Sequence, residues 1–259
     1  MFRKVKYKDG KREIYIGKFR VLKYFRQSQY LEYKFSEVFE AVICKGIYAK
    51  GIDHFKILLK RASVAEKYQK LFFDFFLRSQ KGEELVFIDA GAHAGVFSDI
   101  ALASGGICYA FEPNIYLYAF LKDLYKDNEK LILSNKAVSN QNSTTIFYDD
   151  GEDVVGQGAG IIKTNWHKES GYEVELIDFC EFLHKILKKY KKITLIKIDI
   201  EGAEFDVLDA LIEQKLYEHI EYIMVETHER FFENPSQKIN TLKEKIIQNN
   251  ITNIFLDWV

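Results

Sequence analysis

Four short apolar runs, each closed by an acidic residue, constrain the fold of this chain more than any other feature. Each run has the length of a buried strand, and helical spacing follows each turn. The runs and their acids are residues 85–88 with Asp89, 108–111 with Glu112, 195–198 with Asp199, and 222–225 with Glu226. Strands that alternate with helices of ten or more residues predict an α/β fold with a doubly wound, mostly parallel sheet.

The position of these acids predicts a ligand site. In open parallel sheets, ligands bind beyond the carboxyl ends of the strands, near the point where the strand order reverses. The four closing acids should therefore gather at one edge of the sheet.

The first strand-to-helix turn, residues 89–98 (DAGAHAGVFS), limits the choice of cofactor. A GxGxxG dinucleotide fingerprint that starts at Gly91 would need glycine where the chain has His93 and Val96. The chain also lacks the GxxxxGK[ST] pattern of a P-loop. These observations disfavour a nicotinamide-dependent reductase and a P-loop enzyme.

The position of a second acid, Glu112, indicates the kind of cofactor. Glu112 lies 23 positions after Asp89, at the end of the next strand. An acid in this place can accept hydrogen bonds from both hydroxyls of a ribose. Together, the small-residue turn and Glu112 favour a cofactor that contains adenosine.

Charge divides the chain into two parts. Residues 1–80 hold 19 basic and 8 acidic residues, a net charge of +11, whereas the remainder carries −12. We expect residues 1–80 to form a basic extension, with an edge hairpin at Asp9–Gly10 and a helical stretch over 29–78, that covers an acceptor site. Residues 81–259 form the cofactor-binding domain, interrupted by a β-rich insertion at about 139–175.

Cysteine usage and hydropathy indicate the compartment. Cys44, Cys108 and Cys180 are odd in number and never form a CxxC pair, so neither a disulfide framework nor a zinc ribbon is expected. No run approaches the roughly 18 apolar residues of a membrane span. We therefore expect a cytoplasmic protein without a transmembrane segment.

Several strings resemble the FkbM-type S-adenosylmethionine (SAM)-dependent methyltransferases, over roughly residues 82–259. The strings are residues 87–98, 111–114, 135–139, 195–204 and 225–228, of which KIDIEGAE at 197–204 is the most specific. The resemblance implies a Rossmann-like sheet of the class I methyltransferase type, SAM as cofactor, and methyl transfer to sugars, polyketides or other small metabolites. His93 departs from the pattern, since relatives often have Asn there.

The resemblance also implies a set of cofactor contacts. These contacts are Asp89, Gly91, His93, Gly95, Glu112 and Asn114, with Asn135 and Ala137 beside the adenine.

The catalytic residues are expected after the runs at 195–198 and 222–225. Asp199 and Glu201 follow the strand that faces the methyl group in this fold, and His228 follows Glu226. We expect His228 or Asp199 to be the base, whereas Glu201 could instead begin the next helix. The same residues could hold a divalent cation such as magnesium or manganese, although the sequence predicts no metal.

The predicted function is O-methylation of a sugar or another small-molecule hydroxyl in bacterial capsule or surface-glycan biosynthesis. The expected acceptor is a small molecule, such as a nucleotide-linked or phosphorylated sugar. The alternatives are N-methylation, methylation of a phosphorylated acceptor, and a nucleic-acid-binding protein with the same fold. No Arg cluster or nucleic-acid motif supports the last of these. The sequence does not indicate an oligomeric state.

Overall fold

The computed structural model describes residues 2–6, 11–16, 19–25, 66–148, 158–164, 167 and 171–258. The chain divides into two compact units, Met1–Ile47 and Tyr48–Val259. Strands β1 (Phe2–Lys6), β2 (Lys11–Ile16) and β3 (Phe19–Phe25) form an antiparallel sheet in the first unit. The structure confirms the predicted pairing of the first two strands. The turn at Asp9–Gly10 and the expected helical residues before 66 lie outside the described residues.

A six-stranded parallel sheet forms the centre of the larger unit. Its order is β12-β11-β10-β4-β5-β6. The strands are β4 (Val86–Ala90), β5 (Ile107–Phe111), β6 (Leu131–Ser134), β10 (Ile193–Ile198), β11 (Ile220–Val225) and β12 (Ile254–Phe255). The chain builds outward first through β5 and β6, and then on the other side through β10 to β12. The order therefore reverses between β4 and β10, which confirms the predicted doubly wound, Rossmann-like fold.

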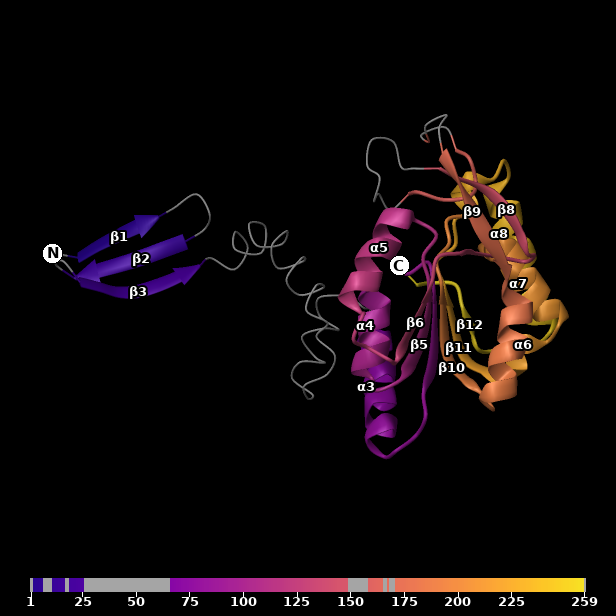
Figure 1. Ribbon diagram of the computed structural model, residues 1–259, viewed down its shortest axis with the longest axis horizontal. Helices are drawn as coiled ribbons and strands as arrows, with labels where there is room; N and C mark the ends of the chain where they lie inside the picture. Colours follow the sequence, from indigo (N-terminus) through magenta and orange to yellow (C-terminus); the bar gives the residue numbers. More distant parts are fainter. Residues whose placement is uncertain are drawn as a thin grey trace. The chain divides into compact units, whose positions relative to one another are not determined.

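Helices cover both faces of this sheet (Figure 1). One face carries α3 (Glu66–Gln80), α4 (Val96–Ala103) and α5 (Ile115–Leu124), and the other carries α6 (Phe179–Lys189), α7 (Glu204–Glu213) and α8 (Pro235–Gln248). Two short 3₁₀ helices, η1 (Leu216–His219) and η2 (Glu229–Phe231), flank β11. Within the described ranges, every helix is too short or too polar to cross a membrane.

Helix α3 belongs to the larger unit, which differs from the expectation of a separate extension up to residue 80. Its Phe72 and Phe75 are fully buried, and their rings pack edge-on against Phe97 and Phe87, respectively. Burying a Phe side chain contributes about 1.5–3 kcal/mol. The apolar stripe of α3 is therefore part of the core, and the boundary between the compact units falls at residues 47/48.

The predicted insertion forms a second small sheet in the order β7-β9-β8. Strands β7 (Ala137–Ser139) and β9 (Gly171–Asp178) are parallel, whereas β8 (Ser143–Tyr148) pairs with β9 in antiparallel fashion. Gly160 exchanges two backbone hydrogen bonds with Tyr148 at the end of β8. The segment around Gly160 is thereby held next to this small sheet.

A buried acid in α4 makes the stability of the fold depend on pH. Asp99 is 2% exposed and accepts a hydrogen bond from the Tyr125 hydroxyl at 2.8 Å. Burial outweighs this bond and raises the pKa of Asp99 from 3.8 to about 7. Between these two values the folded chain binds a proton that the unfolded chain does not, so stability falls as pH rises from about 4 to about 7.

We expect Asp99→Asn to stabilise the fold at pH 8, where it removes a buried charge, and to have little effect at pH 5, where the carboxyl is already neutral. A gain of 1 kcal/mol raises the melting temperature by about 2–4 °C in a domain of this size. Thermal unfolding at both pH values measures the difference. Asp123→Asn, at a side chain that is 82% exposed, is the control. Equal shifts of the Asp99→Asn variant at pH 5 and pH 8 would contradict the prediction.

Candidate active site

The turn after β4 lies directly against the end of β10, where the strand order reverses. Gly91 has a φ of +82°, and its N–H donates to the carbonyl of Phe111. A Cβ at this position would lie 1.8 Å from the backbone oxygen of Asp199. Only glycine fits this crossing, because both the backbone angle and the available space exclude a side chain.

Glu112 holds the next part of the turn. Its carboxylate accepts hydrogen bonds from the backbone N–H groups of His93 (2.6 Å) and Asn114 (2.8 Å). Burial raises the pKa of Glu112 to about 7, although both backbone bonds favour the charged form. His93 has a φ of +47°, a region in which Asn and His are both enriched, so either residue type suits this position.

Asn114 is the N-cap of α5. Its side-chain oxygen accepts hydrogen bonds from the N–H groups of Tyr116 (2.9 Å) and Leu117 (3.2 Å). This cap satisfies donors at the helix start that would otherwise lack partners.

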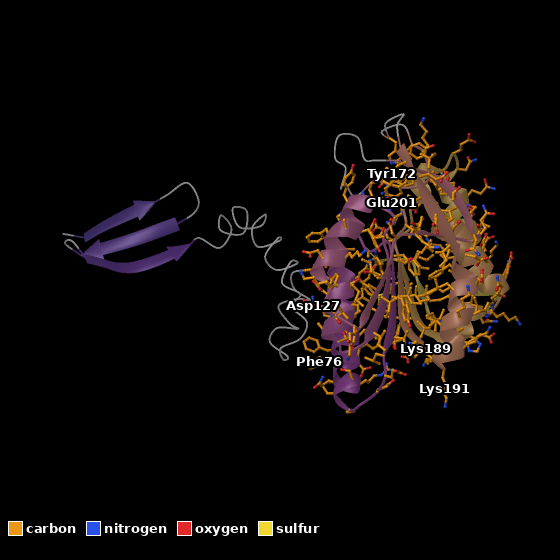
Figure 2. The ribbon with its side chains drawn as sticks, viewed as in Figure 1. Phe76, Asp127, Tyr172, Lys189, Lys191 and Glu201 are labelled. Carbon is orange, nitrogen blue, oxygen red and sulfur yellow. The ribbon has the colours of Figure 1, made fainter. Side chains whose placement is uncertain are left out.

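A cavity of about 490 Å³ opens at this edge of the sheet. Seven of the predicted site residues line it: Gly91, His93, Glu112, Asn114, Ala137, Asp199 and Glu201. In Figure 2, Glu201 lies at the opposite end of the sheet from Lys189 and Lys191, which precede the amino end of β10. The cavity therefore lies where ligands bind in open α/β sheets.

Three predicted cofactor contacts lie behind the cavity lining and support it. Asp89 is fully buried and accepts a hydrogen bond from the Ser98 hydroxyl at 2.7 Å. Gly95 is the N-cap of α4, at a φ of +84°. The Asn135 amide donates to the backbone oxygens of Glu112 and Pro113. In this structure these residues shape the turns that surround the cavity.

Lys197 in β10 links this strand to the neighbouring β4. Its ammonium group is buried, donates to the backbone oxygen of Gly91, and lies 3.1 Å from Asp199 and 3.6 Å from Asp89. Burial opposes the charge of Lys197, but Asp199 and Asp89 outweigh this effect and raise its pKa. Lys197 is thus a buried partner of both acids.

An acidic cluster surrounds His228 at the ends of β10 and β11. The Nε2 atom of His228 lies 3.3 Å from Glu201, 3.6 Å from Glu226 and 3.9 Å from Asp199. On the other side of the ring, Nδ1 lies 2.8 Å from the Glu204 carboxylate. Burial lowers the pKa of His228, but Glu201 and Glu204 outweigh it and raise the value to about 10. Burial and the nearby Asp199 also raise the pKa of Glu226.

Helix α7 begins three residues later than Glu201, which differs from the alternative that Glu201 starts this helix. Glu201 has a φ of +53°, so it belongs to a tight turn before α7. The buried Glu204 accepts hydrogen bonds from the N–H groups of Ile200 (2.9 Å) and Gly202. Glu204, the first residue of α7, therefore stabilises the turn in which Glu201 lies at the cavity.

The structure brings further residues to the cavity that the sequence did not single out. Trp258 comes from the chain end after β12, Arg230 from η2, and Lys136 and Ile161 from around the small sheet. Arg230 lies only two residues after His228, so its position in the sequence could have identified it as a residue of the site. Trp258 and Ile161 are far from every motif in sequence, and only the fold brings them together.

The fold and the crevice at its reversal of strand order define a Rossmann-like α/β protein. The model of the methyltransferase FkbM domain matches residues 89–248, and the chain belongs to this family. The family is one of methyltransferases, and it implies SAM as the methyl donor.

Comparison with solved structures gives one further similarity. The chain is similar to a crystal structure of methyltransferase FkbM from Methylobacillus flagellatus KT, with 13% sequence identity and a TM-score of 0.38. The match covers 63% of this chain and 37% of that chain, so this chain spans well under half of that protein's length. No curated protein matches the chain.

Proposed function

We propose that this protein transfers a methyl group from SAM to a hydroxyl of a sugar or another small molecule. One observation carries the proposal: a single cavity is lined both by the turn around Glu112 and by the acids Asp199 and Glu226. The first end suits a nucleoside cofactor, and the second end suits hydroxyl groups, because carboxylates accept their hydrogen bonds.

The residues at the first end fit SAM. Gly91 lets the backbone approach a ligand closely, and Glu112 presents carboxylate oxygens that can accept hydrogen bonds from ribose hydroxyls. Val138 and Phe147 add apolar lining for an adenine ring. Bound SAM supplies an electrophilic methyl group on a sulfonium centre.

At the second end, protein side chains orient the acceptor and take up its proton. The acceptor oxygen attacks the methyl carbon, so a C–O bond forms as the C–S bond breaks, and the hydroxyl proton must leave. Of the two residues predicted as base, Asp199 lines the cavity, whereas His228 lies behind it at 1% exposure. We therefore favour Asp199 as the group that contacts the hydroxyl, a role that typically contributes 10²–10⁴-fold to the rate.

The charges along the cavity support a neutral group at the reacting end of the acceptor. Asp199, Glu201 and Glu226 would repel an anion there. Lys136 and Arg230 also line the cavity and carry positive charge, and Arg230 lies 3.9 Å from Glu201. A nucleotide-linked or phosphorylated sugar fits this distribution if its phosphate lies near these two cations. Surface-glycan biosynthesis is the setting that we propose for such an acceptor.

Calorimetric titration with SAM and S-adenosylhomocysteine tests the cofactor end. We expect the wild-type chain to bind both ligands, and Glu112→Ala to weaken binding at least about 100-fold, since hydrogen bonds to a charged group contribute about 1.5–3 kcal/mol each. Glu129→Ala, at an exposed acid, should bind like the wild type.

Two outcomes would contradict the proposed function. One is a wild-type chain that binds neither ligand, and the other is a Glu112→Ala variant that binds as tightly as the wild type. Salt-dependent binding of RNA or DNA in the absence of cofactor binding would favour the nucleic-acid alternative.

A further inference from the structure

We propose that Asp199, Glu226 and His228 bind one divalent cation of the manganese type at the acidic end of the cavity. These residues come from the turns after β10 and β11, two neighbouring parallel strands. Each offers one ligand atom, and the three atoms lie within 4.8 Å of one another.

The spacing of the ligand atoms suits an octahedral ion. His228 Nε2 lies 3.6 Å from a Glu226 oxygen and 3.9 Å from an Asp199 oxygen. Ligands at roughly 2.1 Å from an octahedral ion are about 3 Å apart when adjacent and about 4 Å apart when opposite. The separations from His228 lie between these limits, so small side-chain movements would complete the coordination.

The surroundings of His228 orient it as a ligand. Its Nδ1 atom lies 2.8 Å from the Glu204 carboxylate, and Glu204 is in turn held by the N–H groups of Ile200 and Gly202. With the Nδ1 proton donated to Glu204, Nε2 faces Asp199 and Glu226, and a cation that binds there would replace the proton on Nε2. Metal-binding histidines almost always donate their other ring N–H to a carboxylate or carbonyl in this way.

The Nε2 atom itself is the independent sign of a missing ligand. It is buried, it faces the acids, and it makes no hydrogen bond. A buried polar atom without a hydrogen bond is unfavourable, because burial removes its water partners and nothing replaces them. A cation bound to Nε2 would remove this cost.

The excess of negative charge around His228 also favours a cation. Asp199, Glu201 and Glu226 all lie within 3.9 Å of the same ring nitrogen. Among the described residues, the cations paired with these three acids besides His228 are Lys197, 3.1 Å from Asp199, and Arg230, 3.9 Å from Glu201. Arg230 is 58% exposed and Glu226 pairs with neither cation, so a divalent ion would neutralise charge that the protein leaves in excess.

The donor set indicates which ion binds. Two carboxylates favour hard ions such as Mg²⁺ and Mn²⁺, whereas one imidazole favours first-row transition metals, and Mn²⁺ satisfies both preferences. Asp199 and Glu226 line the cavity, with side chains 27% and 30% exposed, while His228 lies behind them. The remaining coordination positions therefore face the cavity.

This arrangement narrows the acceptor class, a step that rests on the proposed function. Three protein ligands leave about three positions on a six-coordinate ion. An acceptor with two neighbouring hydroxyl oxygens, such as a vicinal diol, would occupy two of them. A hydroxyl coordinated there would lose its proton more readily, because the ion would stabilise the resulting alkoxide. Asp199 offers one oxygen to the ion, so its second carboxylate oxygen would take up the proton.

Titration with MnCl₂ tests the cation site directly. The full chain is treated with a chelator and dialysed, and free Mn²⁺ is measured by electron paramagnetic resonance. We expect one Mn²⁺ per chain and a nitrogen coupling from coordinated imidazole in pulsed spectra. Asp199→Asn and Glu226→Gln should weaken binding at least 10-fold, and Glu204→Gln, which acts through His228, should weaken it by about 10- to 100-fold.

Asp206→Asn, at an exposed acid in α7, is the matched control and should bind Mn²⁺ like the wild type. The proposal is overturned if the wild type binds no Mn²⁺, if both Asp199→Asn and Glu226→Gln bind it unchanged, or if the nitrogen coupling is missing. Titration of the same samples with S-adenosylhomocysteine reports the cofactor end separately. A chain that binds this ligand but no Mn²⁺ keeps the proposed function and loses only the cation site.

Discussion

Replacing Lys197 with methionine is expected to reduce the free energy of unfolding by about 3–5 kcal/mol, the usual cost of removing one partner of a buried ion pair. The Lys197 side chain is 7% exposed, and it lies between Asp89, which is fully buried, and Asp199. Without its ammonium group, the Asp89 charge would lose the cation that lies 3.6 Å from it. At about 2–4 °C per kcal/mol, the melting temperature should fall by about 10 °C.

A double-mutant cycle tests this explanation. Asp89→Asn removes the charge that Lys197→Met would strand, and the amide can still accept the hydrogen bond of Ser98. The double variant should therefore lose less stability than the sum of the two single variants. Strictly additive losses in chemical denaturation would show that the charge interaction is not the cause.

Gly91→Ala should destabilise the fold and remove cofactor binding, because its Cβ would lie 1.8 Å from the Asp199 backbone oxygen. The left-handed backbone costs about 1–2 kcal/mol for any residue with a Cβ. The steric overlap adds about 1–3 kcal/mol and pushes the ends of β4 and β10 apart. We expect binding of S-adenosylhomocysteine to weaken at least 10-fold.

Gly82→Ala separates these two contributions. Gly82 has a similar φ, +87°, but a Cβ there would meet no atom within 4 Å. This variant should show only the backbone cost and bind S-adenosylhomocysteine like the wild type. Equal effects of the two substitutions in thermal unfolding and calorimetry would disprove the steric explanation.

The pattern of apolar runs and closing acids was enough to predict the sheet and the position of its ligand site. Strands β4, β5, β10 and β11 begin within two residues of the predicted runs, and Glu112, Asp199 and Glu226 line one cavity. This success has a simple reason: parallel strands that are buried on both faces need continuous apolar sequence, and their ends meet at one edge.

The division of the chain was harder to predict from local signals. The basic character of residues 1–80 indicated a separate extension, yet Phe72 and Phe75 of α3 are buried in the core of the larger unit. Charge is set by the exposed face of a helix, whereas packing is set by the opposite face. Composition averaged over both faces therefore could not locate the boundary.

The sequence alone thus determined the fold class and the acids at the strand ends, because these depend on short-range patterns of hydrophobicity and charge. The family was indicated by the resemblance of its motifs, above all KIDIEGAE at 197–204. Tertiary structure decided which acids face the cavity, since Asp89 and Asp199 end neighbouring strands but only Asp199 lines it. It also decided the surroundings of His228. One ring nitrogen of His228 contacts Glu204, and the other lies close to three further acids. These contacts join residues from different strands and turns, and their distances are set by how the strands pack.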